Sequence, residues 1–112
     1  MDNPNWRCYD AASEDDLPKL IRLRQDGSPW NQLTFIVAAR NGNIRMLAWL
    51  LRNGCPVSQH VTEMAALHGK TETLDWLVRN GLEFNVIRCI EAATIRGHKS
   101  TAVYIKQHLD TR

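Results

Sequence analysis

The sequence predicts an all-α solenoid of four helix-turn-helix repeats, and the main reason is internal repetition. Three stretches align in register at a spacing of 27 residues: AASEDDLPKLIRLRQDG at 11–27, AARNGNIRMLAWLLRNG at 38–54 and AALHGKTETLDWLVRNG at 65–81. A fourth, looser copy begins at residues 92–93 and has one additional residue before its glycine. Self-similarity over tens of residues is typical of a stacked array, in which no unit buries its apolar face alone.

The length and composition predict one domain. The chain has 112 residues, of which 44% are hydrophobic and 23% charged, as in ordinary globular proteins. We expect a single domain over residues 1–112, complete from Met1 to its last repeat. The first and last repeats should cap the array because their second helices carry a polar face. The expected repeats span about 3–27, 30–54, 57–81 and 84–110.

Each repeat is expected to begin with a short helix that contains a pair of alanines and ends at a glycine. The small alanine side chains allow neighbouring helices to approach closely. Gly42, Gly69 and Gly97 are expected to end these helices in the left-handed conformation, which is strained for other residues. In the first repeat, Asp15 stands where the glycine belongs.

The second helix of each repeat should run from that turn to the next glycine. In residues 44–51 only Arg45 is polar, so this helix is expected to be buried inside the array. Trp49 and Trp76 occupy the same repeat position and are expected to pack between repeats.

The connectors between repeats each place an apolar residue before an Asn or Ser. This pattern predicts a buried side chain followed by the N-cap of the next helix. The expected pairs are Trp30-Asn31, Val57-Ser58 and Phe84-Asn85. Asn3-Pro4 offers a similar start to the first helix, with proline at its first position.

The sequence carries no pattern of a catalytic, metal or cofactor site, so we expect a non-enzyme without a cofactor. Cys8, Cys55 and Cys89 are widely spaced and are expected to be free thiols. Phosphate loops, His-Glu-x-x-His and the nucleophile elbow do not occur, and the histidines are scattered singly. His98 follows Gly97, where it is expected to form a hydrogen bond at a helix start.

The apolar runs and the N-terminus predict a cytosolic or nuclear protein without a membrane partner. The longest apolar run, residues 46–51, is far too short to cross a bilayer. The N-terminal residues lack the basic-then-apolar pattern of a secretory signal.

The repeats resemble ankyrin repeats, in the short-period form found in protists and large DNA viruses. The pattern Ala-Ala-x-x-Gly-x-(Ile/Leu)-x-x-Leu-x-x-Leu-Leu-x-x-Gly matches residues 38–54, and the connector at 27–31 is similar to the family's Gly-Cys-Pro-Trp-Asp. The match covers roughly residues 3–110. Because ankyrin units usually have about 33 residues, the shorter period implies that the β-hairpin finger is shortened or absent.

The resemblance implies a non-catalytic protein-protein interaction module, an adaptor or inhibitor that binds an unidentified protein as a monomer. Binding is implied through the concave first-helix surface, at the two residues between each alanine pair and its turn. For Leu67 and Ile95, packing between adjacent first helices is an equal alternative to partner contact. For Arg40 and His68 the groove is favoured, because interfaces combine apolar anchors with arginine. The implied partner-binding residues are Ser13, Glu14, Arg40, Asn41, Leu67, His68, Ile95 and Arg96.

The alternative function is binding of nucleic acid or another anionic surface through basic residues of repeats 2–4. The net charge is only +2, but residues 1–26 hold six acids and four bases, whereas the remainder holds six acids and ten bases. The aromatic residues are assigned to the core and the acidic first repeat would repel a duplex, so nucleic acid is the less expected partner. The basic residues concerned are Arg40, Arg45, Arg52, Lys70, Arg79, Arg96 and Lys99.

Overall fold

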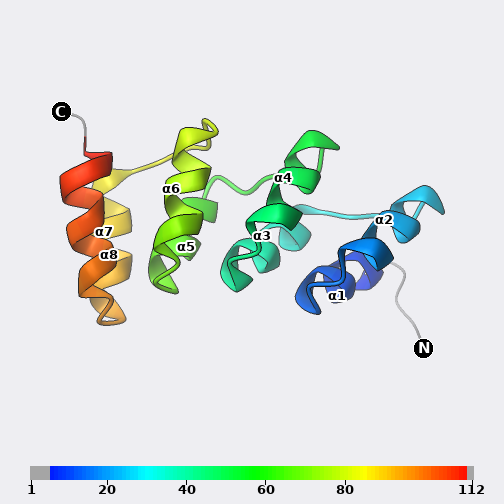
Figure 1. The fold of residues 1–112 in the computed structure, drawn as a ribbon, viewed down its shortest axis with the longest axis horizontal. Helices are drawn as coiled ribbons and strands as arrows, with labels where there is room; N and C mark the ends of the chain where they lie inside the picture. The colour runs from blue at the N-terminus through cyan, green and yellow to red at the C-terminus, as the bar shows by residue number, and fades with distance from the viewer. Residues whose placement is uncertain (1–5, 111–112) are drawn as a thin grey trace. The chain divides into compact units, whose positions relative to one another are not determined.

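The computed structural model describes residues 6–110, which contain helices and no strand. Each predicted repeat contains one pair of helices (Figure 1). By their contacts the residues fall into two compact units, divided between Ser58 and Gln59, and each unit is described separately. The helices are α1 (Arg7–Ser13), α2 (Leu17–Gln25), α3 (Gln32–Asn41), α4 (Ile44–Arg52), α5 (Val61–Leu67), α6 (Thr71–Arg79), α7 (Val86–Ile95), α8 (Lys99–Tyr104) and the π-helical turn η2 (Ile105–Leu109).

In the first unit, α1 packs against α2 and α3, and α3 packs against α4. The alanine pairs of α1 and α3 are fully buried, which is consistent with the close approach predicted for these two helices. The larger core side chains are Leu20, Phe35, Val37, Met46, Leu47 and Leu50. At the surface, the Asn43 side-chain amide donates to the Asp15 carboxylate at 3.2 Å and so links the turns after α1 and α3.

In the second unit, α5 packs against α6 and α7, and α7 packs against α8 and η2. The core holds Val61, Leu74, Leu77, Cys89 and Ile105, together with Ala65, Ala66 and Ala93. The hydroxyls of Thr71 and Thr101 lie 2.7 Å apart and connect the second helices α6 and α8.

The turn between the two helices of each pair contains one residue with a left-handed backbone. Gly42, Gly69 and Gly97 have φ angles of 74°, 66° and 77°, as predicted. Asp15, at the corresponding position of the first pair, has a φ of 59° and is the only described non-glycine residue with positive φ. Asp tolerates this conformation better than most residues do, so the turn forms without glycine.

Two of the predicted N-caps are confirmed and one is wrong. Asn31 accepts from the Leu33 backbone amide at 2.9 Å, and Asn85 accepts from Arg88 N at 3.0 Å. Ser58 does not cap α5, because that helix begins two residues later, after His60. The cap expected at Asn3-Pro4 lies outside the described residues.

The tryptophans and His98 also differ from expectation. Trp49 and Trp76 are only partly buried. Trp49 makes an edge contact with Trp30 of the connector before α3, at 5.9 Å between ring centroids, and lines a hollow together with Ile21 and Arg24 of α2. His98 makes no side-chain cap bond at the start of α8. Its ring instead lies against Gly69, in the space that a Cβ atom would occupy.

The final helix changes from α to π geometry after Tyr104, whereas the sequence pattern indicated one continuous helix. The π-helical turn brings the rings of Tyr104 and His108 to 4.6 Å. The Tyr104 hydroxyl donates to Asp75 at 2.8 Å, and Arg79 donates to the same carboxylate at 2.8 Å. These bonds, chiefly that of Arg79, hold the pKa of Asp75 below its usual value.

The three free cysteines are buried, as their interpretation as packing residues requires. Burial is the main cause that raises the pKa of all three thiols, to about 12 for Cys55 and about 11 for Cys89. The buried thiols stay neutral at pH values where exposed thiols ionise. Because their folded pKa is raised, their contribution to stability is complete below the unfolded pKa of about 8.5. It declines as the pH rises from there toward 11–12.

We therefore expect a disulfide reagent such as DTNB to react with the native protein at least about 100-fold more slowly than with the urea-unfolded chain at pH 8. The measurement is the release of the coloured thiol over time, with and without urea. A native thiol that reacts as fast as the unfolded chain would show that the segment carrying it is not packed as described.

Candidate functional site

The four implied contact residues of the first unit lie at the ends of α1 and α3. Ser13, Glu14 and Arg40 are exposed. The Asn41 side chain donates to the Ser13 carbonyl oxygen at 3.1 Å and thereby ties the two helix ends together. Asn41 is thus part of the packing between α1 and α3, and Arg40 is the charged side chain that this end of α3 presents to solvent.

The four implied contact residues of the second unit lie at the ends of α5 and α7. Leu67 and Ile95 are the last residues of these helices, and His68 and Arg96 follow them. Ile95 is 77% exposed, a large apolar surface for an isoleucine, whereas Leu67 is half-buried. Leu67 and Ile95 line the same hollow between α5 and α7, so the structure brings this predicted pair together.

Two neighbouring hollows lie along α5 and α7, and we call them together the α5–α7 groove. The larger part has a volume of about 410 Å³, with an apolar lining from Met64, Leu67, Ala92 and Ile95. The smaller part, of about 220 Å³, shares His60, Glu63 and Arg88 with it. The remaining lining residues are Glu91 in the larger part and Gln59, Glu83, Phe84 and Asn85 in the smaller.

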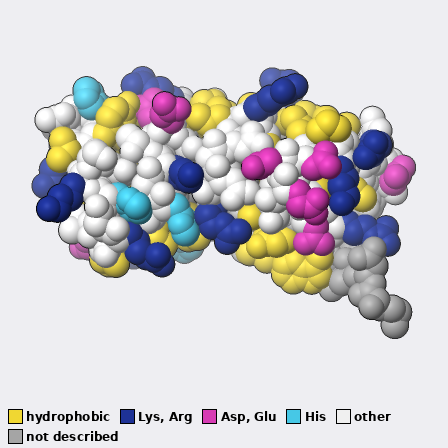
Figure 2. All heavy atoms as spheres, turned by 60° about the horizontal axis from the view of Figure 1, so that its bottom comes forward, with side chains coloured by type: hydrophobic (Ala, Val, Ile, Leu, Met, Phe, Trp, Pro, Cys, Tyr) yellow, Lys and Arg dark blue, Asp and Glu magenta, His cyan; other side chains and the backbone are white. Residues whose placement is uncertain are grey.

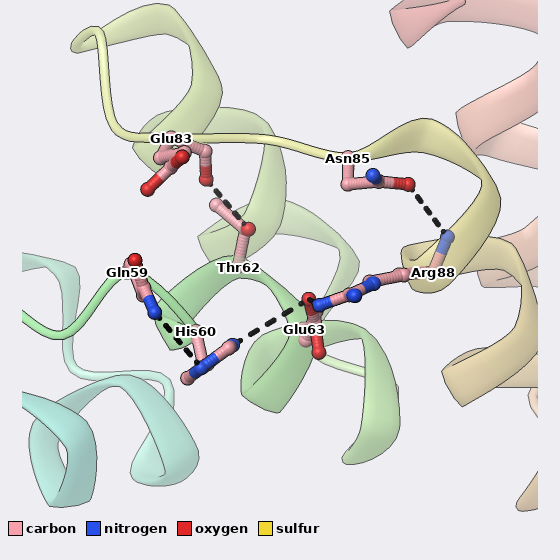
Figure 3. Close-up of polar contacts among 7 residues, drawn as sticks. All are labelled: Gln59, His60, Thr62, Glu63, Glu83, Asn85 and Arg88. Atoms are coloured by element: carbon pink, nitrogen blue, oxygen red, sulfur yellow. Dashed lines mark hydrogen bonds and ion pairs between the residues drawn. The ribbon is translucent and has the colours of Figure 1, made fainter.

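The polar centre of the groove is held together by Glu63. Figure 3 shows the side chains of His60 and Arg88 directed toward Glu63 from opposite sides. The Glu63 carboxylate oxygen Oε1 lies 3.7 Å from both His60 Nδ1 and Arg88 Nη1. Because His60 and Glu63 belong to the start of α5 and Arg88 to α7, these contacts link the two walls of the groove.

The connector between α6 and α7 is fixed against α5 at the same end (Figure 3). The buried Thr62 hydroxyl donates to the Glu83 carbonyl oxygen at 2.8 Å. Asn85 then caps α7. These bonds hold the connector in place at this end of the groove, and a preformed surface of this kind loses less entropy when a partner binds.

The charged and imidazole side chains of the groove that sequence reasoning missed are His60, Glu63, Glu83, Arg88 and Glu91. A signal for some of them was present: Glu63 precedes Leu67, and Glu91 precedes Ile95, by four residues, which places each pair on one helix face. The closeness of Arg88 to Glu63 depends on how α5 and α7 are packed, which the pattern of one helix does not contain.

The first unit has a hollow of about 400 Å³ beside Trp30 and Trp49. Its charged side chain, Arg24, already donates to the Ser28 carbonyl oxygen at 2.6 Å and lies over the Trp30 ring at 4.0 Å. Because these contacts use Arg24 to hold the connector after α2, we regard this hollow as part of the packing.

The α5–α7 groove presents both apolar and polar groups. Its lining contains apolar, carboxylate, amide, imidazole and guanidinium groups, with no thiol or hydroxyl exposed to a ligand. Within residues 6–110, no cluster of three His, Cys, Asp or Glu side chains could hold a metal ion. None of the helices there combines the length and apolar character needed to cross a bilayer. No family model matches the chain, and neither curated proteins nor solved structures gave a match.

Proposed function

We propose that this chain is a non-catalytic protein-binding module, an adaptor or inhibitor, built as an ankyrin-like solenoid of four helix pairs. The 27-residue sequence period supports the repeat assignment. So does the left-handed residue at the equivalent positions 15, 42, 69 and 97. The connectors between helix pairs contain no strand in the described residues, which fits a repeat whose β-hairpin finger is shortened or absent.

The observation that carries the proposal is the α5–α7 groove. It combines the half-buried Leu67 and the exposed Ile95 with a polar and charged border, the arrangement found at protein interfaces. Burying a side chain of this size contributes about 1.5–3 kcal/mol, so Ile95 is able to act as an anchor for a partner. Arg96 follows it at the surface and is of a type enriched in interface hot spots.

The first unit is proposed to contribute through Arg40. Its side chain is exposed at the end of α3. Arg40 occupies the same position in its repeat as Leu67 does in α5. Ser13 and Asn41 support that position through the hydrogen bond between the Asn41 side chain and the Ser13 carbonyl oxygen. The Glu14 carboxylate oxygen Oε1 lies 3.9 Å from Lys19 Nζ.

Binding of nucleic acid receives less support. Among the basic candidates, Arg79 is held by Asp75 at 2.8 Å. Figure 2 shows Lys and Arg side chains scattered over the visible face, and acidic side chains gathered toward the N-terminal end. Binding to arbitrary duplex DNA at low salt, with a steep loss as salt rises, would favour this alternative. No binding at low salt is the result that the protein-binding proposal predicts.

The proposal is tested by comparing the natural chain with Ile95→Glu and Val103→Glu. Val103 is also an exposed apolar residue, at 49%, but it lies on α8 and does not line the groove. We expect Ile95→Glu to weaken partner binding at least about tenfold, equivalent to about 1.4 kcal/mol, and Val103→Glu to leave it unchanged. Arg40→Glu tests the first unit in the same way.

The measurement is quantitative affinity purification of proteins from cells that contain the chain, followed by titration of each recovered partner. A partner that binds the natural chain and Ile95→Glu equally would contradict the assignment to the groove. Failure of the natural chain to retain any protein more strongly than the doubly substituted Ile95→Glu/Arg40→Glu chain would contradict the proposed function.

A further inference from the structure

We propose that the α5–α7 groove binds a peptide segment with one large apolar side chain followed, on one side, by lysine or arginine residues. The inference rests on the proposed function and adds to it the chemistry of the partner. It is carried by the apolar lining at one end of the groove and by two carboxylates that pair with no other group in the described part of the chain.

The charge of the groove is opposite to that of the rest of its unit. The groove contains three carboxylates, of Glu63, Glu83 and Glu91, and one guanidinium, of Arg88. The other described residues of the unit carry more bases than acids: Lys70, Arg79, Arg96, Lys99 and Lys106 against Glu72, Asp75 and Asp110. An acidic groove on a basic unit favours a basic segment and repels an acidic one.

Two of the three carboxylates are available to a partner. Glu63 is engaged by both His60 and Arg88 at 3.7 Å. By contrast, no hydrogen bond or ion pair involves the side-chain carboxylate of Glu83 or Glu91 within residues 6–110, and both residues are exposed. A basic side chain of a partner that comes to lie beside either carboxylate would gain an ion pair, and no existing ion pair of the groove would be broken.

The order of groups along the groove sets the spacing of the expected peptide. Ile95 and Leu67 mark the apolar end, and Glu91 lies one helical turn away, about 6 Å along α7. The start of α7 at Asn85 is about 15 Å from Ile95 along the helix axis, and Glu83 lies two residues before it in the connector. Since an extended peptide advances about 3.3 Å per residue, we expect basic residues about two and five positions from the apolar anchor.

Exposed ion pairs contribute little affinity, about 0–1 kcal/mol each. The apolar anchor should therefore supply most of the binding and the carboxylates most of the selectivity. A ligand with acidic residues at the same two positions loses both pairs and meets two like charges, which predicts a preference for the basic ligand of about tenfold or more at low salt.

The experiment uses the ¹⁵N-labelled full chain and three synthetic peptides with blocked ends, at equal concentrations. They are Gly-Leu-Ser-Lys-Ser-Ser-Lys-Gly, the same peptide with both lysines replaced by glutamate, and the lysine peptide with leucine replaced by glycine. We expect the first peptide to shift amide resonances of α5 and α7 and to bind at least tenfold more tightly than the other two. Glu83→Lys/Glu91→Lys should reverse the preference toward the glutamate peptide, and Glu72→Gln, outside the groove, should not change it.

The inference is overturned if the glutamate peptide binds as tightly as the lysine peptide, if the shifts lie away from α5 and α7, or if no peptide shifts the groove at millimolar concentration. These failures are separable from failure of the proposed function. If natural-partner binding still depends on Ile95 while the peptides show no charge preference, the binding module stands and its expected partner chemistry is wrong.

Discussion

Phe35→Ala is expected to lower the free energy of unfolding of the first unit by about 3–5 kcal/mol, the usual cost of emptying a buried phenylalanine site. Phe35 is fully buried in α3, the helix that packs against both α1 and α4. Deleting its ring leaves a cavity among helices whose alanine contacts give little room for collapse. Urea denaturation followed by circular dichroism, with the natural chain as reference, measures the loss.

The matched control is Leu33→Ala, two residues earlier in α3, where the side chain is 37% exposed. We expect a loss below about 1 kcal/mol there, because less surface is taken from water in the folded state. The rate at which a thiol reagent labels Cys8 and Cys55 reports on unfolding of the first unit, and the rate for Cys89 reports on unfolding of the second. Equal losses for Phe35→Ala and Leu33→Ala would contradict the core described for α3.

Gly69→Ala is expected to destabilise the second unit for two separate reasons. The φ angle of 66° is strained for alanine, at a cost of about 1–3 kcal/mol. In addition, a Cβ atom there would lie 2.6 Å from His98 Nδ1, so the imidazole must move. Overpacking of this kind costs about 1–3 kcal/mol more. The measurement is again urea denaturation, followed by the rate at which a thiol reagent labels the buried Cys89 of the second unit.

Gly97→Ala separates the two reasons, because its φ is 77° but a Cβ atom would meet nothing within 4 Å. We expect Gly97→Ala to show only the backbone cost. Adding His98→Ala to Gly69→Ala should recover most of the difference in the free energy of unfolding between Gly69→Ala and Gly97→Ala. If Gly69→Ala costs no more than Gly97→Ala, His98 does not occupy the position described.

The turns were predictable from the sequence because a left-handed residue leaves a local signal. Gly42, Gly69 and Gly97 fulfil that expectation, and Asp15 shows that the position matters more than the residue type. The cap of α5 was not predictable in the same way. Ser58 has the right chemistry, but the helix begins only after His60, and nothing in the local pattern fixes that start.

The apolar part of the candidate site was predictable from the repeat pattern, whereas its polar part was not. Leu67 and Ile95 follow from their place in the repeat, and the structure puts both in one groove. The polar centre around Glu63 depends on the packing of α5 against α7, a contact between residues far apart in the sequence. The burial of Trp49 was overestimated because repeat position alone does not show how much of a large ring a neighbour covers.

The most direct test of the central claim, that a protein partner binds in the α5–α7 groove, is site-specific photocrosslinking. The crosslinker benzoylphenylalanine is placed in the full chain at Leu67 in the groove or at Val103 on α8, outside it. The account predicts a crosslink to the partner from position 67 and none from position 103. A partner that crosslinks from position 103 and not from position 67 would contradict it.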